Sequence, residues 1–154
     1  MQLDIFVDSI HIELSLWDTA GQEEFDRLRS LSYDDTHAIM LCFSVSSPDS
    51  LENVEGKWIQ EIAENCPGVK IVLVALKCDL REEEDHEGEE QEGREKALVS
   101  YDQGLEVAKR IGASRYLECS AMKNRGVNEA FTEAARVALS VKGGGKEGGK
   151  CVVM

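Results

Sequence analysis

Residues 10–22, IHIELSLWDTAGQ, carry the strongest structural signal in the chain. Their first half alternates apolar and polar residues with a period of two, which predicts a strand with one buried face. Residues 3–7 have the composition of a partner strand, and Asp8-Ser9 between the two stretches predicts a hairpin turn. The chain is therefore expected to open with a β-hairpin.

Two later stretches, 38–45 and 69–76, are apolar except at Ser44 and Lys70 and contain β-branched residues, which is typical of strands covered on both faces of a parallel sheet. Helices are expected between and after them. Their signals are the N-cap Ser47 before Pro48, the capping box of Ser100 and Gln103, and an apolar period around residues 127–134. A short strand is expected at 115–119. Strands alternating with helices predict a doubly wound, mostly parallel α/β sheet.

Charge is distributed unevenly along the 154 residues, whose formal net charge is -13. Nine acidic residues and one basic residue fall between positions 82 and 95, so much of the acidity is local. This balance argues against nucleic-acid binding, because no basic stripe could neutralise phosphates. We expect one domain over residues 1–139, an acidic and partly disordered insertion at 82–96, and a flexible Gly/Lys tail over 140–154.

The first chemical motif directly follows the strand predicted at residues 10–17. A carboxylate at this place, Asp18, could hold Mg²⁺ through water, and the backbone N–H of Gly21 could approach a γ-phosphate. Gln22 could orient an attacking water. By itself this motif is short, and an ordinary turn is the alternative.

Two further motifs follow predicted strands. Asp79 could accept two hydrogen bonds from guanine, which adenine cannot donate, while Lys77 lays its methylene stem along the base. In the segment 119–123, CSAMK, the small residue Ala121 would let a backbone N–H reach the guanine carbonyl. Each motif alone could be a solvated loop. All three, however, fall at the carboxyl ends of strands, where open α/β sheets bind ligands.

This ordered set resembles the small GTPase superfamily, and residues 17–29, WDTAGQEEFDRLR, resemble the Rho family, in particular fungal Rho-type polarity GTPases. The resemblance runs from about residue 3 to residue 139 and implies a P-loop NTPase-like G-domain fold. It implies Gln22 as the catalytic residue and Asp18 as the Mg²⁺ residue, through water. The implied nucleotide-binding residues are Asp18, Thr19, Ala20, Gly21, Gln22, Lys77, Asp79, Ser120, Ala121 and Met122. Leu76 departs from the Asn or Thr that is usual at its position.

Members of that family begin with a strand, a G-x-x-x-x-G-K-[ST] loop, a helix and a switch threonine, and none of these is recognised before residue 10. The near-match at 144–150 is rejected, because Cys151 replaces Ser or Thr and no helix can follow it. Charged hydrogen bonds contribute about 1.5–3 kcal/mol each, so losing on the order of four removes roughly 6–12 kcal/mol, or about four to eight decades of affinity. We therefore expect weak or absent GTP/GDP binding and no catalysis.

The same comparison predicts a gap in the sheet. In the family, the first strand lies between the strands predicted here at 10–17 and 38–45. These two strands are expected either to pair directly or to expose their edges, and exposed edges would favour aggregation. Without the first helix, part of one sheet face is expected to remain uncovered.

The last four residues, Cys151-Val152-Val153-Met154, form a C-a-a-X motif, which predicts prenylation of Cys151 by a prenyltransferase, with Met154 favouring farnesyl. The lysines near it are too few for a strong polybasic signal, so one lipid should anchor only marginally.

The resemblance implies a membrane-tethered switch that binds GTP and hydrolyses it to GDP, at the cytoplasmic face of the plasma membrane and partly in the cytosol. Implied partners are exchange factors, GTPase-activating proteins, a dissociation inhibitor and effectors of the Rho type. Two alternatives stay open. The chain could be a nucleotide-free module in which residues 22–33 bind regulators or effectors, or it could be part of a longer coding sequence.

Overall fold

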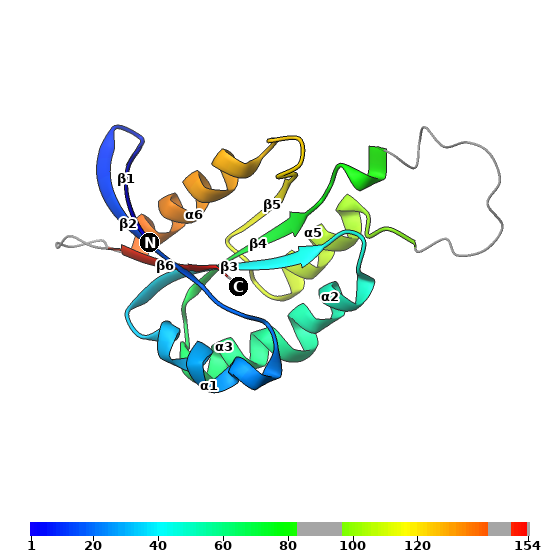
Figure 1. The fold of residues 1–154 in the computed structure, drawn as a ribbon, viewed down its shortest axis with the longest axis horizontal. Coiled ribbons are helices and arrows are strands. Elements are labelled where there is room, and N and C mark those ends of the chain that lie inside the picture. The colour runs from blue at the N-terminus through cyan, green and yellow to red at the C-terminus, as the bar shows by residue number, and fades with distance from the viewer. Residues whose placement is uncertain (83–96, 142–148, 154) are drawn as a thin grey trace.

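The computed structural model describes residues 1–82, 97–141 and, for the backbone alone, 149–153. Their strands form one six-stranded sheet in the order β1-β2-β6-β3-β4-β5, with helices on both faces (Figure 1). β1 and β2 are antiparallel, and every other neighbouring pair is parallel. The predicted doubly wound α/β fold is therefore confirmed.

The predicted hairpin consists of β1 (Gln2–Val7) and β2 (Ile10–Asp18). Asp8 and Ser9 at its turn both have positive φ, 50° and 66°, as a two-residue hairpin turn requires. The Asp8 carboxylate accepts two hydrogen bonds from the Arg136 guanidinium, each 2.8 Å long. The turn is thus fastened to the last helix of the chain.

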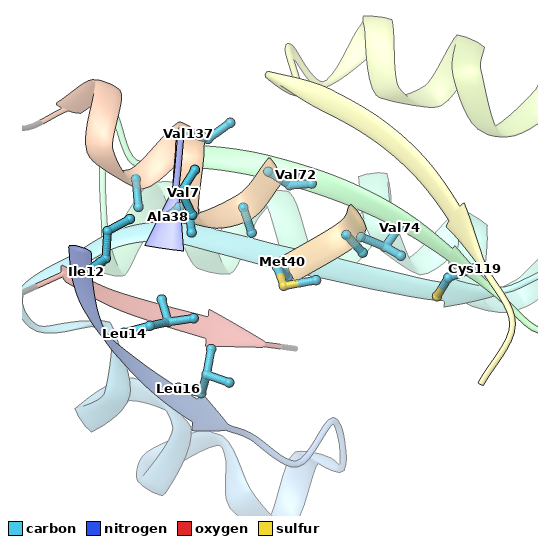
Figure 2. Packing of buried hydrophobic residues seen from close by; sticks show 14 residues of the cluster. Val7, Ile12, Leu14, Leu16, Ala38, Met40, Val72, Val74, Cys119 and Val137 are labelled. Atoms are coloured by element: carbon cyan, nitrogen blue, oxygen red, sulfur yellow. The ribbon is translucent and has the colours of Figure 1, made fainter. Parts of the chain in front are cut away.

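The centre of the core is made by β3 (Thr36–Ser44) and β4 (Lys70–Leu76), whose middle residues are almost completely buried. Alternate residues face opposite sides, because side chains alternate along a strand. Ala38 and Met40 join the cluster drawn in Figure 2, whereas Ile39 and Leu41 join the cluster on the other face. Both strands have the two covered faces that their composition predicts.

Helix α6 (Val127–Val141) packs on the first of these faces, and its buried residues are small, mainly alanines (Figures 1 and 2). It ends at Val141, two residues after the expected domain boundary. The other face is covered by the remaining helices. They are η1 (Glu23–Phe25), α1 (Asp26–Ser30), η2 (Leu31–Tyr33), α2 (Pro48–Asn53), the π-helical turn η3 (Val54–Trp58), α3 (Ile59–Asn65) and α5 (Tyr101–Arg110).

The helix starts and the last predicted strand are confirmed. Ser47 accepts a hydrogen bond from the Ser50 N–H and is followed by Pro48, and Ser100 and Gln103 form the capping box. β5 (Arg115–Cys119) has the predicted bounds. Most of the acidic insertion, residues 83–96, lies outside the described residues.

The gap predicted in the sheet is filled in a way that the sequence did not suggest. Strand β6 (Gly149–Val153), from the segment expected to be a flexible tail, lies between β2 and β3 and pairs with both (Figure 1). The two expected outcomes, direct pairing and exposed edges, are thus both wrong for the described chain. The physical reason is that an extended segment can satisfy the backbone groups of both edges at once. Residues 142–148 lie outside the described residues.

The face that carries α6 is partly open beside the hairpin. A cavity of about 280 Å³ lies between the first two strands and the start of α6, with Leu3, Ile5, Leu16 and Phe131 in its lining. This apolar opening agrees with the uncovered face expected from the sequence.

Candidate functional site

The site predicted from the sequence lies at the carboxyl edge of the parallel strands. β2 ends at Asp18, β4 leads into residues 77–79, and β5 leads into residues 120–122. Because parallel strands end at one edge, all three motifs lie on the same side of the sheet. The loops after β4 and β5 are neighbours, whereas β6 and β3 separate β2 from them.

The loops after β4 and β5 are tied together beside Asp79. The Cys78 N–H donates to the Cys119 carbonyl at 3.2 Å, and Lys77 takes a left-handed conformation with φ of 62°. Asp79 is only 5% exposed, and Ser120 is fully buried. A hydrogen bond from Ser120 lowers the pKa of Asp79, and this outweighs the effect of burial. Asp79 is therefore a buried, ionised carboxylate.

The 120–122 loop is held in shape by short backbone bonds. Ser120 and Arg125 exchange N–H···O=C hydrogen bonds of 2.8 and 2.9 Å, and the Ser120 hydroxyl accepts from the Lys123 N–H at 3.0 Å. Ala121 and Met122 lie at the exposed tip of the loop. A guanine base that reached Asp79 would therefore lie beside the small residue Ala121 at the exposed tip of this loop. This arrangement fits the guanine site predicted from the sequence.

An ion pair behind this loop was not predicted. The Arg81 guanidinium donates to both carboxylate oxygens of Glu118, at 2.7 and 2.8 Å, and to the Val99 carbonyl at 2.8 Å. Burial acts to raise the pKa of Glu118, but hydrogen bonds from Arg81 and Tyr116 lower it overall. Arg81 thus connects the strand that precedes the 120–122 loop to the segment that precedes α5.

The loop over residues 18–22 is more exposed. Asp18, Ala20, Gly21 and Gln22 are all exposed, and Thr19 is half-buried. A methyl group added at Gly21 would lie 3.5 Å from the Trp58 ring, so the loop runs close over that indole. In the described part of the chain no group of three or more possible metal-binding side chains occurs. The exposed carboxylate of Asp18 at the end of β2 fits the single-carboxylate role, in which Mg²⁺ relies on phosphate oxygens and water.

A buried arginine, Arg29, fixes this loop to the helices below it. Its Nη1 donates to the Ala20 carbonyl at 2.7 Å, and its Nε and Nη2 donate to the two oxygens of Glu61 at 2.6 and 2.7 Å. The guanidinium also bonds Asp26 and lies 4.8 Å above the Trp58 ring. Sequence reasoning missed this network, because an arginine in a polar helical stretch gives no signal of burial.

The same network includes Tyr33, whose hydroxyl donates to Glu61 at 2.8 Å. Burial and this bond raise the pKa of Tyr33, while the Arg29 bond leads the causes that lower the pKa of Glu61. The pKa of Arg29 is raised, chiefly by Glu61, so the pair is ionised at neutral pH. The 18–22 loop thus lies on a largely buried, charged network.

Two predicted features remain to be located. Gly149 and Lys150, from the rejected near-match, lie in β6 and not before a helix, which agrees with that rejection. The backbone of Cys151 also lies in β6, aligned with Leu16 of β2 and Ala38 of β3. Within the described ranges, no helix combines the length and the apolar character needed to cross a membrane.

Comparison with known proteins agrees with this geometry. A sequence model of the Ras family matches residues 1–140. The chain is 65% identical to the GTP-binding protein RHO3 of Eremothecium gossypii over 89% of this chain and 66% of that protein. It is 65% identical to rho3 of Schizosaccharomyces pombe over 95% and 69%, and 62% identical to RHO3 of Saccharomyces cerevisiae over 89% and 68%.

The order of the strands in the sheet, and the three motifs at the carboxyl edge of the strands, define the class as a P-loop NTPase-like G domain. Members of this family are GTP hydrolases. Within that class the chain belongs to the Ras family, as a small GTPase of the fungal Rho type. It spans about two thirds of the length of the curated relatives that it matches.

Proposed function

We propose that this chain is a Rho-type switch protein that recognises guanine nucleotide through its base. The observation that carries this proposal is the buried, ionised Asp79, 5% exposed, beside the fully buried Ser120. A buried carboxylate with a lowered pKa is suited to accept the two donors of guanine. Lys77, Ala121 and Met122 would complete the base site.

The phosphate side of the same proposal rests on the 18–22 loop. The backbone N–H groups of Thr19, Ala20 and Gly21 would face phosphate oxygens, Asp18 would serve Mg²⁺ through water, and Gln22 would orient the attacking water. A Mg²⁺ ion bound there would neutralise charge on the phosphates. Because these residues are few and four of the five are exposed, we propose that the 154-residue chain holds nucleotide mainly by the base and turns it over poorly.

Calorimetric titration with GDP and Mg²⁺ tests this proposal. We expect a dissociation constant that is micromolar or weaker, no binding of ADP, and a loss of at least tenfold in Asp79→Ala. Glu64→Ala, which removes an exposed carboxylate from α3, is the matched control and should bind as the parent does. Nanomolar affinity would contradict base-only binding, and equal affinity in Asp79→Ala would contradict the base site.

A second candidate function is a protein-binding module that works without turnover. It is favoured by the surface of α1 and its neighbours, where Leu28 and Leu31 are 65% and 70% exposed above the Arg29 support. Regulators and effectors of the Rho type would bind there. Affinity of the nucleotide-free chain for a Rho exchange-factor domain should fall in Leu28→Ala/Leu31→Ala, whereas unchanged affinity would argue against this surface.

For localisation, we propose that Cys151 is prenylated and tethers the chain to the cytoplasmic face of the plasma membrane, with a cytosolic fraction. The C-a-a-X sequence supports this, and a single lipid gives only reversible binding. Cys151→Ser should move the protein into the soluble fraction, because the serine oxygen is not an acceptor. Equal membrane fractions for the variant and the parent would refute the tether.

A further inference from the structure

A groove lies between two helical walls on the face of the sheet opposite α6. One wall is α2 with the turn η3 that follows it, the other wall is α5, and residues 97–99 also line the space (Figure 1). We call it the α2–α5 groove. Its volume of about 350 Å³ is near the lower end of the range for ligand pockets, so it suits a few side chains and not a whole helix.

The floor of the α2–α5 groove is apolar and held in place. Leu51, Val99 and Val107 line it and are 9%, 3% and 4% exposed. The Val99 N–H donates to the Val45 carbonyl at 2.8 Å, and the Val99 carbonyl accepts from Nε of Arg81 at 2.8 Å. Because both backbone groups of Val99 are bonded, a partner would not have to order this part of the floor.

The rim of the α2–α5 groove is acidic. Glu52 on α2 and Glu106 on α5 are both exposed and come from opposite walls. Arg110 donates to both carboxylate oxygens of Glu55, at 2.8 and 3.1 Å, and lies 4.0 Å from Glu106. Three carboxylates thus share one guanidinium, which is already engaged by Glu55, and the lining carries a net negative charge.

This charge distinguishes between the possible occupants of the groove. Residues 82–95 of the chain, with nine acids and one base, have the same sign of charge as the rim. A second copy of the chain, with a formal net charge of -13, and an anionic lipid surface would be repelled as well. A cationic segment of another protein would instead be attracted, because its charge complements that of the rim.

We propose that the α2–α5 groove docks a segment of a partner protein in which aliphatic side chains are flanked by arginine or lysine. An aliphatic side chain would lie on Leu51, Val99 and Val107, and a cation would lie between Glu52 and Glu106. The buried aliphatic anchor supplies affinity, and the paired charges select a basic segment. This surface is separate from that of α1, and docking in it does not depend on nucleotide binding.

Fluorescence anisotropy with two labelled peptides tests this docking on the full chain. One peptide is Arg-Leu-Arg-Arg-Leu-Leu-Arg, and the other has serine in place of each leucine, so both carry the same charge. At physiological ionic strength the leucine peptide should bind at least about tenfold more tightly, because only its side chains can cover the apolar floor. Equal affinities, or no binding of the leucine peptide, would overturn the proposal.

Two double variants with the same change in charge separate the groove from the total charge. Glu52→Gln/Glu106→Gln should weaken binding of the leucine peptide about fivefold or more, because two ion pairs are lost. Glu64→Gln/Glu129→Gln neutralises exposed carboxylates on α3 and α6 and should change the affinity by less than about twofold. Equal losses in the two variants would mean attraction by total charge alone, which overturns a site in the groove.

Amide chemical shifts of the isotope-labelled full chain locate the bound peptide without any substitution. On titration with the leucine peptide, the largest changes should fall in residues 48–55, 97–99 and 103–110, which contain the lining of the groove. Largest changes in residues 23–33 would instead place the peptide on the surface of α1 and would overturn the assignment to the α2–α5 groove.

Discussion

Replacing Arg29 by methionine removes the charge that holds the 18–22 loop to α3 while keeping a long apolar stem. The Arg29 side chain is 1% exposed, and that of its partner Glu61 is 18% exposed. In the variant, Glu61 keeps only the Tyr33 hydroxyl as a donor from this network. Its carboxylate would then be largely buried without a balancing charge.

The size of the effect follows from this burial. Removing one partner of a buried ion pair costs about 3–5 kcal/mol. Because Glu61 retains some solvent contact and the Tyr33 bond, the lower end applies, and we expect a loss of about 3 kcal/mol. For a domain of this size, that corresponds to a fall in Tm of about 6–12 °C.

Urea unfolding at pH 7, followed by tryptophan fluorescence, measures this loss. Arg110→Met is the matched control, because Arg110 and Glu55 form a surface pair, with side chains 55% and 39% exposed, worth at most about 1 kcal/mol. The double variant Arg29→Met/Glu61→Leu should recover most of the loss, since an apolar pair has no charge left unbalanced. Equal losses in Arg29→Met and Arg110→Met would refute the argument.

Two other perturbations have definite expected outcomes. The pKa of Glu61 is lowered in the folded state, so its contribution to stability is present above the ordinary glutamate range and is lost as the pH falls through the lowered value. Urea midpoints measured from pH 7 to 3 should therefore decline less steeply in Glu61→Gln than in the parent. Gly104→Ala would place its Cβ 2.1 Å from the Tyr116 hydroxyl and 3.1 Å from the Phe43 ring, so it should destabilise by about 1–3 kcal/mol. A Cβ added by Gly56→Ala would have no atom within 4 Å, so this variant should be neutral or stabilising by up to about 1 kcal/mol. A Tm for Gly104→Ala above that of Gly56→Ala would contradict this account of the packing.

Strands and helices that leave a local pattern in the sequence were predicted correctly. The alternation before Asp18 predicts β2, and the mostly apolar stretch 38–45 predicts β3, because burial of one or both faces determines where apolar residues occur along a strand. The capping box at Ser100 marks the start of α5, since the two side chains that form it are three residues apart.

Features that depend on distant pairing were not predicted. Arg29 and Glu61 lie on different helices, and no local pattern reveals that they meet. The same holds for β6, whose five residues are also typical of a lipid-acceptor tail. Asp79 is predicted from the sequence to bind the base, but its burial beside Ser120 could be seen only once the fold had brought two neighbouring loops together.

The position of β6 between β2 and β3 has a consequence for the rate at which the described sheet forms. Strand β6 joins the hairpin β1–β2 to β3 within the sheet, although it follows β2 in the chain only after β3, β4 and β5. The hairpin, which would be marginally stable in isolation, also contacts the rest of the protein through α6, where Arg136 bonds Asp8. Pairing across almost the whole length of the chain is slow, because loop closure must precede the contacts that reward it. The ladders of β6 with β2 and β3 are therefore expected to form later than the ladder of the hairpin, whose strands are joined by Asp8 and Ser9 alone.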